Sequence, residues 1–293
     1  MGLSSSEVKC IWAAGAVLGE GPFWSETRNA VYWVDIKGQR LHRYDLDTGG
    51  CHSWPMPERI GWVVEREVGG LVIGLKSGFA FLNPKTLEIT PIGDPEPEHP
   101  GNRLNDAKVD PWRRIWAGTM DDAETEPTGA LYRLDPDLTW TCWDEGYVVS
   151  NGPAFSPDGK TLYHTSSATR EIFAFDLGAD GALSNKRLFL RFKEEDGYPD
   201  GITTDAEGGL WVAHWLGWRV SRFYSDGTLD RYILLPVARV TNLTFGGHKL
   251  DRLFVTTASI GATEEERRNQ PLAGGLFELS PGVTGLPTYK FGG

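Results

Sequence analysis

Leu210-Trp211-Val212-Ala213 is one of six short runs that share a pattern: a bulky apolar residue, an aromatic or β-branched residue, then small residues. The other five are Val31-Tyr32-Trp33-Val34, Leu71-Val72-Ile73-Gly74, Ile115-Trp116-Ala117-Gly118, Leu162-Tyr163-His164-Thr165 and Leu253-Phe254-Val255-Thr256. Their first residues lie 40, 44, 47, 48 and 43 positions apart. A repeat of about forty residues built from short strands is typical of β-propellers. The sequence therefore predicts an all-β six-bladed β-propeller with four antiparallel strands per blade, as a single domain over residues 1–293.

Turn signals divide each repeat further. Asp47-Thr48-Gly49-Gly50 and Ser156-Pro157-Asp158-Gly159 are examples, and short alternating stretches lie between such turns. This pattern indicates hairpins rather than helices. In each repeat we expect the shared run to form the second strand and the strand before it to lie next to the propeller axis. The segment from Ala262 to Leu272 is the one place where a short helix is expected.

A polar residue precedes five of the six runs at a nearly constant distance. These residues, 10 or 11 positions ahead, are Glu20, Asn105, Asn151, Asp200 and Asn242. Equivalent positions of successive blades meet at the axis, so five oxygen-bearing side chains are expected around one point. A single pair such as Asn151-Gly152 is more simply explained as a tight turn. The recurrence of such residues in phase with the strands favours a binding site.

The composition of this ring indicates which ligand it would hold. Glu20 and Asp200 supply carboxylates, and the asparagines supply amide oxygens. Oxygen ligands of this kind suit Ca²⁺, Mg²⁺ or Mn²⁺, while Zn²⁺ and Fe(II) stay open as alternatives. Two buried acids repel one another unless a cation or protons lie between them. The sequence therefore predicts one divalent metal cation at the hub.

Arg103 is a further candidate for a residue of the binding site. It lies two positions before Asn105, so on a regular strand both side chains point to the same side. Its guanidinium can donate hydrogen bonds to a hydroxylated or carbonyl ligand. Equally, it can pair with one of three nearby acids, Asp106, Asp121 or Asp122. Both interpretations stay open at this point.

Aromatic residues and histidines accompany the same strands. Trp62, Tyr198 and Trp215 are expected near the rim of the hub, where they either close the channel or stack on the apolar face of a sugar. His164 and His214 lie inside strand runs. We expect both to be buried, hydrogen-bonded structural residues.

Composition and charge exclude several classes of partner. The net charge is −11, which leaves no excess of basic side chains to neutralise phosphates, so neither nucleic acid nor an anionic membrane surface is expected as a partner. The three cysteines have no metal-binding spacing and are expected to be free thiols. The first seven residues lack the features of a signal peptide. We expect a cytoplasmic monomer.

Several longer stretches resemble the SMP-30/gluconolactonase/regucalcin family, and most closely its bacterial sugar lactonases. They are Leu18-Gly19-Glu20-Gly21-Pro22, residues 102–110, Trp116-Ala117-Gly118-Thr119-Met120, Ser150-Asn151-Gly152-Pro153, residues 156–160 and Pro199-Asp200-Gly201. The resemblance covers nearly the whole chain and keeps the order of the motifs. It implies a six-bladed propeller with one divalent metal on the axis. It also implies hydrolysis of sugar aldonolactones (xylono-, arabinono-, gluconolactone or similar) to aldonic acids in carbohydrate catabolism.

The resemblance also implies residue roles. Glu20, Asn151 and Asp200 would be the metal ligands, with Asp200 also the catalytic general base. Arg103 and Asn105 would bind the hydroxyls and ring oxygen of the substrate. Ala123 stands where some members carry a substrate-contacting Glu. Asp122 is expected to take that contact, and the alternatives are that Glu124 takes it or that the contact is absent.

Two other functions stay open. One is a metal-dependent phosphotriesterase or aryl-esterase-like hydrolase that uses the same site. The other is a non-enzymatic calcium-binding propeller, because a fold alone does not fix a function.

Overall fold

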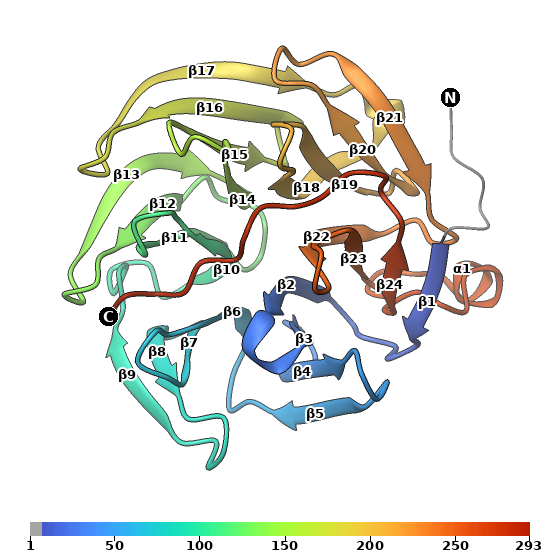
Figure 1. Cartoon of the computed structure of the whole chain (residues 1–293), viewed down its shortest axis with the longest axis horizontal. Coiled ribbons are helices and arrows are strands. Elements are labelled where there is room, and N and C mark those ends of the chain that lie inside the picture. Colours follow the sequence, from blue (N-terminus) through green and yellow to red (C-terminus); the bar gives the residue numbers. More distant parts are fainter. Residues whose placement is uncertain (1–7) are drawn as a thin grey trace.

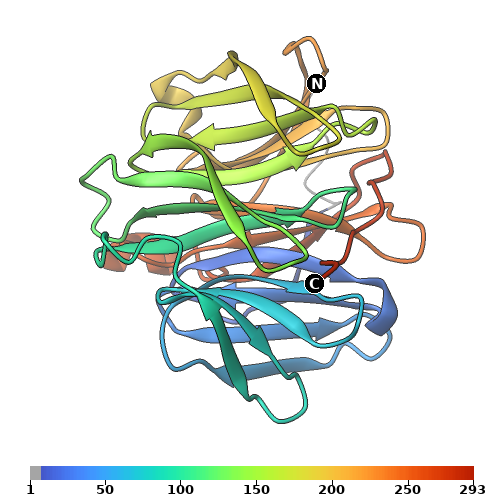
Figure 2. The same cartoon turned by 90° about the vertical axis from the view of Figure 1, so that its left-hand side faces the viewer.

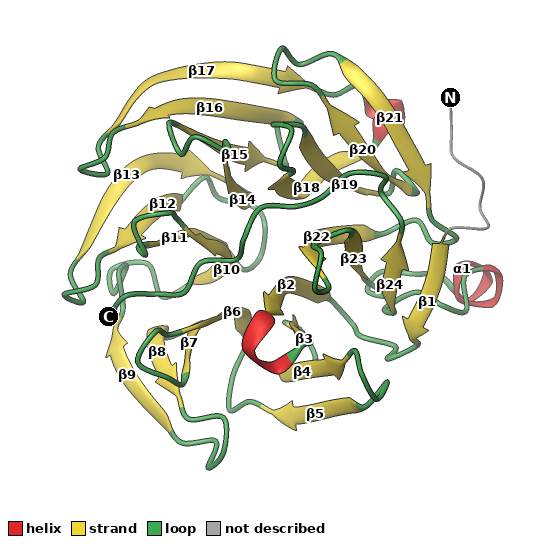
Figure 3. Cartoon of the chain, in the orientation of Figure 1, coloured by secondary structure: helices red, strands yellow, loops and turns green. Residues whose placement is uncertain are grey.

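The computed structural model describes residues 8–293 and folds them into six four-stranded antiparallel sheets around a central axis (Figures 1 and 3). Helix α1 (Glu264–Asn269) and two 3₁₀ turns (Glu26–Arg28 and Glu194–Asp196) are the helical elements of the described part. The six-bladed propeller and the short helix within residues 262–272 are thereby confirmed. The expectation about a signal peptide falls on residues 1–7, outside the described residues.

The blades follow one another along the chain, each with its innermost strand first. Blade 1 contains β2 (Gly19–Ser25), β3 (Ala30–Asp35), β4 (Arg40–Asp45) and β5 (Cys51–Pro55), and blade 2 contains β6 (Ile60–Glu65), β7 (Leu71–Leu75), β8 (Gly78–Leu82) and β9 (Ile89–Gly93). Blade 3 contains β10 (Asn102–Val109), β11 (Ile115–Asp121), β12 (Gly129–Leu134) and β13 (Trp140–Tyr147). Blade 4 contains β14 (Ser150–Phe155), β15 (Thr161–Ser166), β16 (Glu171–Leu177) and β17 (Leu183–Arg191), and blade 5 contains β18 (Tyr198–Thr204), β19 (Leu210–Trp215), β20 (Arg219–Phe223) and β21 (Leu229–Leu234).

Blade 6 combines both ends of the described chain. It contains β22 (Val240–Gly246), β23 (Arg252–Thr257) and β24 (Leu276–Leu279), and β1 (Val8–Trp12) pairs with β24 as its outermost strand. A strand from one end of the chain thus completes a sheet from the other end and joins the last blade to the first. Ring closure of this kind protects sheet edges that would otherwise be open.

The C-terminal segment crosses the hub on one face of the disc (Figures 1 and 2). The Gly285 N–H donates to Leu250 O (2.7 Å), the Phe291 N–H to Glu65 O (2.8 Å) and the Gly292 N–H to Arg113 O (3.0 Å). A small cavity of about 80 Å³ lies under this segment and is lined by the innermost strands of all six blades. The segment therefore covers one end of the axis, and the candidate site lies at the other.

The shared runs form the second strand of each blade, as expected. Trp33, Trp116 and Trp211 on these strands are fully buried. Closer to the axis, backbones leave no room for side chains at some positions. A Cβ on Gly61 would lie 2.5 Å from Leu104 O, which explains glycine at the hub position of blade 2.

Every innermost strand is irregular where it passes the hub. Against its neighbouring strand each one carries one extra residue, between Glu20 and Phe23, Ile60 and Trp62, Leu104 and Ala107, Asn151 and Ala154, Pro199 and Ile202, and Val240 and Asn242. A β-bulge bends the strand and changes the direction of the side chains beside it. The repeated bulge therefore brings the polar ring residues to the axis.

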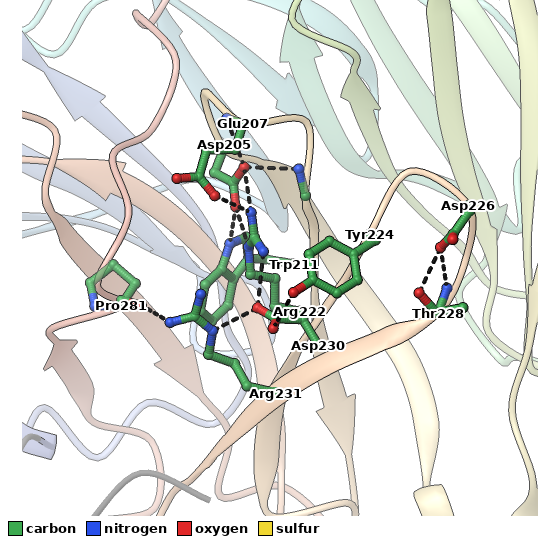
Figure 4. Close-up of polar contacts among 11 residues, drawn as sticks. Asp205, Glu207, Trp211, Arg222, Tyr224, Asp226, Thr228, Asp230, Arg231 and Pro281 are labelled. Atoms are coloured by element: carbon green, nitrogen blue, oxygen red, sulfur yellow. Dashed lines mark hydrogen bonds and ion pairs between the residues drawn. The ribbon is translucent and has the colours of Figure 1, made fainter. Parts of the chain in front are cut away.

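Two blades are braced by a buried aspartate and a tryptophan six positions later. In blade 5, Asp205 accepts hydrogen bonds from the backbone of Glu207 and Gly209, from Trp211 Nε1 (2.8 Å) and from Arg222 Nε (2.6 Å) (Figure 4). The same arrangement joins Asp110, Arg114 and Trp116 in blade 3. In both blades the carboxylate thus connects the turn between the first two strands to the tryptophan side chain of the second strand.

The two histidines of the strand runs and the three cysteines have the states expected for them. His164 and His214 are fully buried, and hydrogen-bond Ser150 Oγ (3.0 Å) and Asp196 O (2.9 Å) respectively, which confirms their structural character. The three cysteines are free. Within residues 8–293 no helix has the length and apolar content required to cross a membrane.

We predict that Arg222→Leu strongly destabilises the protein. The Arg222 side chain is 2% exposed and contacts Asp205, Glu207 and Asp230, so its loss leaves the fully buried Asp205 charge without a cation. Breaking a buried pair by removing one partner costs about 3–5 kcal/mol. Urea unfolding measures the free energy of unfolding.

The control for this prediction is Arg252→Leu. Arg252 pairs with Glu278 at 2.6 Å on the outside of blade 6, and the two side chains are 35% and 24% exposed. Partly solvated pairs contribute at most about 1 kcal/mol. Equal losses of stability in the two variants would contradict the bracing role of Arg222.

Candidate functional site

A cavity of about 610 Å³ opens at the end of the hub opposite the C-terminal segment. Its polar lining contains Glu20, Arg103, Asn105, Asn151 and Asp200, which come from four different blades. All five side chains are buried, and all but Arg103 lie in or next to the bulge of their strand. The structure thus brings together the residues that the repeat pattern placed at the axis, except Asn242, which lies beside the cavity lining.

Hydrogen bonds fix the amide side of the site. Asn105 Nδ2 donates to Asn151 Oδ1 (2.8 Å) and to Ser150 O (2.7 Å), and Asn151 Nδ2 donates to Ser167 Oγ (2.9 Å). Arg103 Nη1 donates to Asn105 Oδ1 (2.5 Å). The chain Arg103–Asn105–Asn151 therefore sets the rotamers of three neighbouring polar groups before any ligand binds.

On the acidic side of the site, the carboxyl groups of Glu20 and Asp200 are buried and interact with each other. Burial, and then repulsion from Asp106, raise the pKa of Glu20 to about 8. Burial, and then repulsion from Glu20 and Asp106, raise the pKa of Asp200 well above its usual value. In the described part of the chain, neither Glu20 nor Asp200 forms a salt bridge. Such a pair is stabilised by a positive charge between its members.

The donor atoms fit a hard divalent cation. Among residues 8–293 no three His, Cys, Asp or Glu side chains are grouped as a metal site. A cation at the hub would therefore combine the two carboxylates with an amide oxygen, and Asn105 and Asn151 both line the cavity with them. Ca²⁺ binds to mixed sets of carboxylate and amide oxygens, and Mg²⁺ and Mn²⁺ also prefer oxygen ligands.

Asp106 and Lys108 lie beside the site. The sequence suggested Asp106 only as a possible partner of Arg103, and no role was expected for Lys108. Asp106 Oδ2 accepts hydrogen bonds from the Gly152 N–H (3.0 Å) and from Asn242 Nδ2 (2.9 Å). Lys108 Nζ donates to Ile202 O (2.9 Å), and burial lowers the pKa of Lys108 to about 8. Strict alternation would turn Asp106 away from Asn105, but both residues lie in the bulge of β10.

Asp122 and Glu124 occupy different positions beside the cavity. Asp122 pairs with Arg103 (2.9 Å), Lys37 (3.1 Å) and Arg59, which bears out the ion-pair interpretation of Arg103. Glu124 belongs to the cavity lining, whereas Asp122 does not. Burial lowers the pKa of Arg103 to about 10, still far above neutrality, so its guanidinium is charged.

The rim of the cavity is largely apolar. Tyr198 and Trp215 line it, as expected. Trp62 does not: it is 1% exposed and packs in the core against Phe79, so its expected place at the rim is wrong. The hub position of blade 2 is Gly61, and the indole after it turns into the blade. Arg239 also lines the cavity, and its place in a loop before β22 left no signal in the repeat pattern.

Comparisons with known proteins identify the family of the chain. The sequence model of the SMP-30/gluconolactonase/LRE-like region matches residues 18–259, most of the chain. The chain belongs to this family. L-arabinolactonase of Azospirillum brasilense is 36% identical over 280 residues, covering 94% of this chain and 92% of that protein. For 6-deoxy-6-sulfogluconolactonase of Pseudomonas putida the identity is 35% over 292 residues, covering 98% and 99%.

A solved structure shows the same similarity in three dimensions. Regucalcin from Agrobacterium tumefaciens, described as a calcium-binding protein, superimposes with a TM-score of 0.93 at 26% identity and covers 96% of both chains. The family thus contains relatives that are named lactonases and a relative that is named for calcium binding.

We predict that the cation-free protein loses stability as the pH rises. Glu20 has a higher pKa when folded than its ordinary value of 4.5, so the folded state holds the proton more tightly. This stabilisation is complete at low pH and is lost as the pH rises from about 4.5 to about 8. Thermal unfolding in excess chelator should show the decline, and Glu20→Gln should make it shallower.

Adding Ca²⁺ at pH 8 tests whether Glu20 binds a cation that stabilises the protein. We expect Ca²⁺ to raise the melting temperature of the wild type and of Glu264→Gln, which removes an exposed carboxylate on α1. It should leave Glu20→Gln unchanged. An equal rise in Glu20→Gln would show that the cation binds elsewhere.

Proposed function

We propose that this protein hydrolyses sugar aldonolactones to aldonic acids and that the reaction depends on a divalent cation at the hub. The observation that carries the proposal is the pair of buried carboxylates, Glu20 and Asp200, at the base of a cavity that Arg103 and Asn105 also line. Membership of a family that contains an arabinolactonase and a sulfogluconolactonase supports lactones as the substrate class.

Glu20, Asn151 and Asp200 would hold the cation. A divalent cation there would supply Lewis acidity, which stabilises negative charge that develops on the lactone carbonyl oxygen. The proposal covers Ca²⁺, Mg²⁺, Mn²⁺, Zn²⁺ and Fe(II) as the cation. Among these, the calcium-binding relative favours Ca²⁺.

Asp200 is proposed as the general base. Its carboxylate accepts a proton from the attacking water while the water oxygen bonds to the lactone carbonyl carbon. When the bond between that carbon and the ring oxygen breaks, the proton passes to the ring oxygen, and the product is the open hydroxy acid.

Arg103 and Asn105 are proposed to orient the sugar. The hydrogen bond between them, and that from Asn105 to Asn151, present their remaining polar atoms in a fixed arrangement. Preorganised donors lose little entropy when a ligand binds. Asp122 stays a predicted substrate contact, and its ion pair with Arg103 favours a role in holding the guanidinium. Glu124 in the lining is the alternative contact.

A second candidate function is cation binding without catalysis. The calcium-binding description of the Agrobacterium relative is the observation that favours it. We also propose a cytoplasmic location, supported by the three free cysteines, and a monomeric state.

A substrate panel separates these functions. Xylono-, arabinono- and gluconolactone are each added with and without chelator, and acid release is followed by a pH indicator. We expect turnover of at least one lactone that chelation abolishes. Turnover of an aryl ester or phosphotriester alone, or calcium binding without any turnover, would reject the lactonase proposal.

We predict that Asp200→Asn lowers kcat for the best lactone by at least ~10², the usual size of a general-base contribution. Asp226→Asn, at an exposed turn, should leave the rate unchanged. Cation binding is measured on the same sample. Full turnover by Asp200→Asn with cation bound would show that another group accepts the proton.

We predict that Arg103→Met raises KM roughly 10- to 100-fold, because hydrogen bonds from a charged donor contribute about 1.5–3 kcal/mol. Arg59→Met is the matched control, since Arg59 pairs with the same Asp122 but does not line the cavity. Its effect on KM should be much smaller. Similar values of KM for the two variants would remove Arg103 from the substrate contacts.

A further inference from the structure

We infer that Asn242 is a positioning residue for the hub cation: its side-chain amide holds the Glu20 carboxylate in the orientation in which it binds the metal. The inference rests on the proposed function, because it assumes that Glu20 is a ligand. Asn242 lies on β22 of blade 6 and does not itself line the cavity. It therefore acts on the ligand, not on the substrate.

The orientation of the Asn242 amide is fixed by the backbone. Its Oδ1 accepts a hydrogen bond from the Leu243 N–H (2.8 Å). The NH₂ group must then face the opposite way, where Nδ2 donates to Glu20 Oε2 (3.0 Å) and to Asp106 Oδ2 (2.9 Å). One neutral donor group thus bridges two carboxylates that come from blades 1 and 3.

The Asn242 side chain is buried and packs closely against the backbone after Asp200. Asn242 is 3% exposed. A Cβ on Gly201 would lie 2.1 Å from Asn242 Cγ, so the glycine after Asp200 is what admits the amide to the axis. Asn242 consequently contacts the residue that follows one proposed ligand and bonds directly to the other. Its position is determined by blades 1, 3, 5 and 6 together.

A neutral donor is suited to this place. It satisfies one lone pair on each carboxylate without adding a positive charge that would compete with a cation. The Gly21 N–H (3.0 Å) is the other donor to Glu20 Oε2, so Oε1 is left for the metal. Without Asn242, Glu20 and Asp106 would face each other unbridged and Glu20 would turn from its rotamer. Loss of a residue that orients a metal ligand typically costs about 10- to 100-fold in affinity.

The test is cation affinity, which does not depend on turnover. Calorimetry with Ca²⁺ gives Kd for the wild type, Asn242→Leu and Asn242→Ala, and Tb³⁺ luminescence lifetimes in H₂O and D₂O report the water bound to the ion. We expect both variants to bind Ca²⁺ about 10- to 100-fold more weakly and to leave more water on Tb³⁺. Thr244→Val, two positions along β22 and away from the cavity base, should match the wild type.

The outcomes separate this inference from the proposed function. If Asn242→Leu does not fold, the smaller Asn242→Ala decides the question. A folded variant with the affinity and Tb³⁺ hydration of the wild type overturns the role of Asn242 alone. A wild type that binds no cation overturns the proposed cation site itself. Weakened binding with added water in the variants, but not in Thr244→Val, supports the inference.

Discussion

Each innermost strand carries one residue more than the strand beside it where it passes the axis, and the remaining features of the site depend on this irregularity. A regular strand would send alternate side chains to opposite faces of its blade. The bulge instead concentrates polar groups of several blades at one point. In blade 3 it even brings the adjacent Asn105 and Asp106 into the same buried network.

Concentrating acids at a buried point opposes folding, and the surrounding structure offsets the cost only in part. Asn242 bridges Glu20 and Asp106, and the positive charge of Lys108 acts on Asp106. No comparable partner reaches Asp200 among the described residues, and its pKa is raised accordingly. Repulsion between these carboxyl groups therefore destabilises the hub, and a divalent cation would relieve that repulsion. Repulsion of this kind is common at functional sites.

The sequence predicted the architecture and the main ring residues because both follow from a period. Strand runs about 40–48 residues apart define blades, and side chains in phase with those runs must converge. Trp62 was misplaced because a phase argument assumes that every blade uses its hub position in the same way, whereas blade 2 places Gly61 there. Asp106 was expected only as a partner of Arg103, and Arg239 was missed, because a bulge and a loop do not follow the period of the strands.

We propose that one cation lies between Glu20 and Asp200. A crystal structure of the protein grown with Mn²⁺, with an anomalous difference map, tests this most directly. We predict a single strong peak in the hub within bonding distance of oxygens from Glu20, Asn151 and Asp200. A map with no peak there, or with the two carboxylates too far apart to contact the same ion, would contradict it.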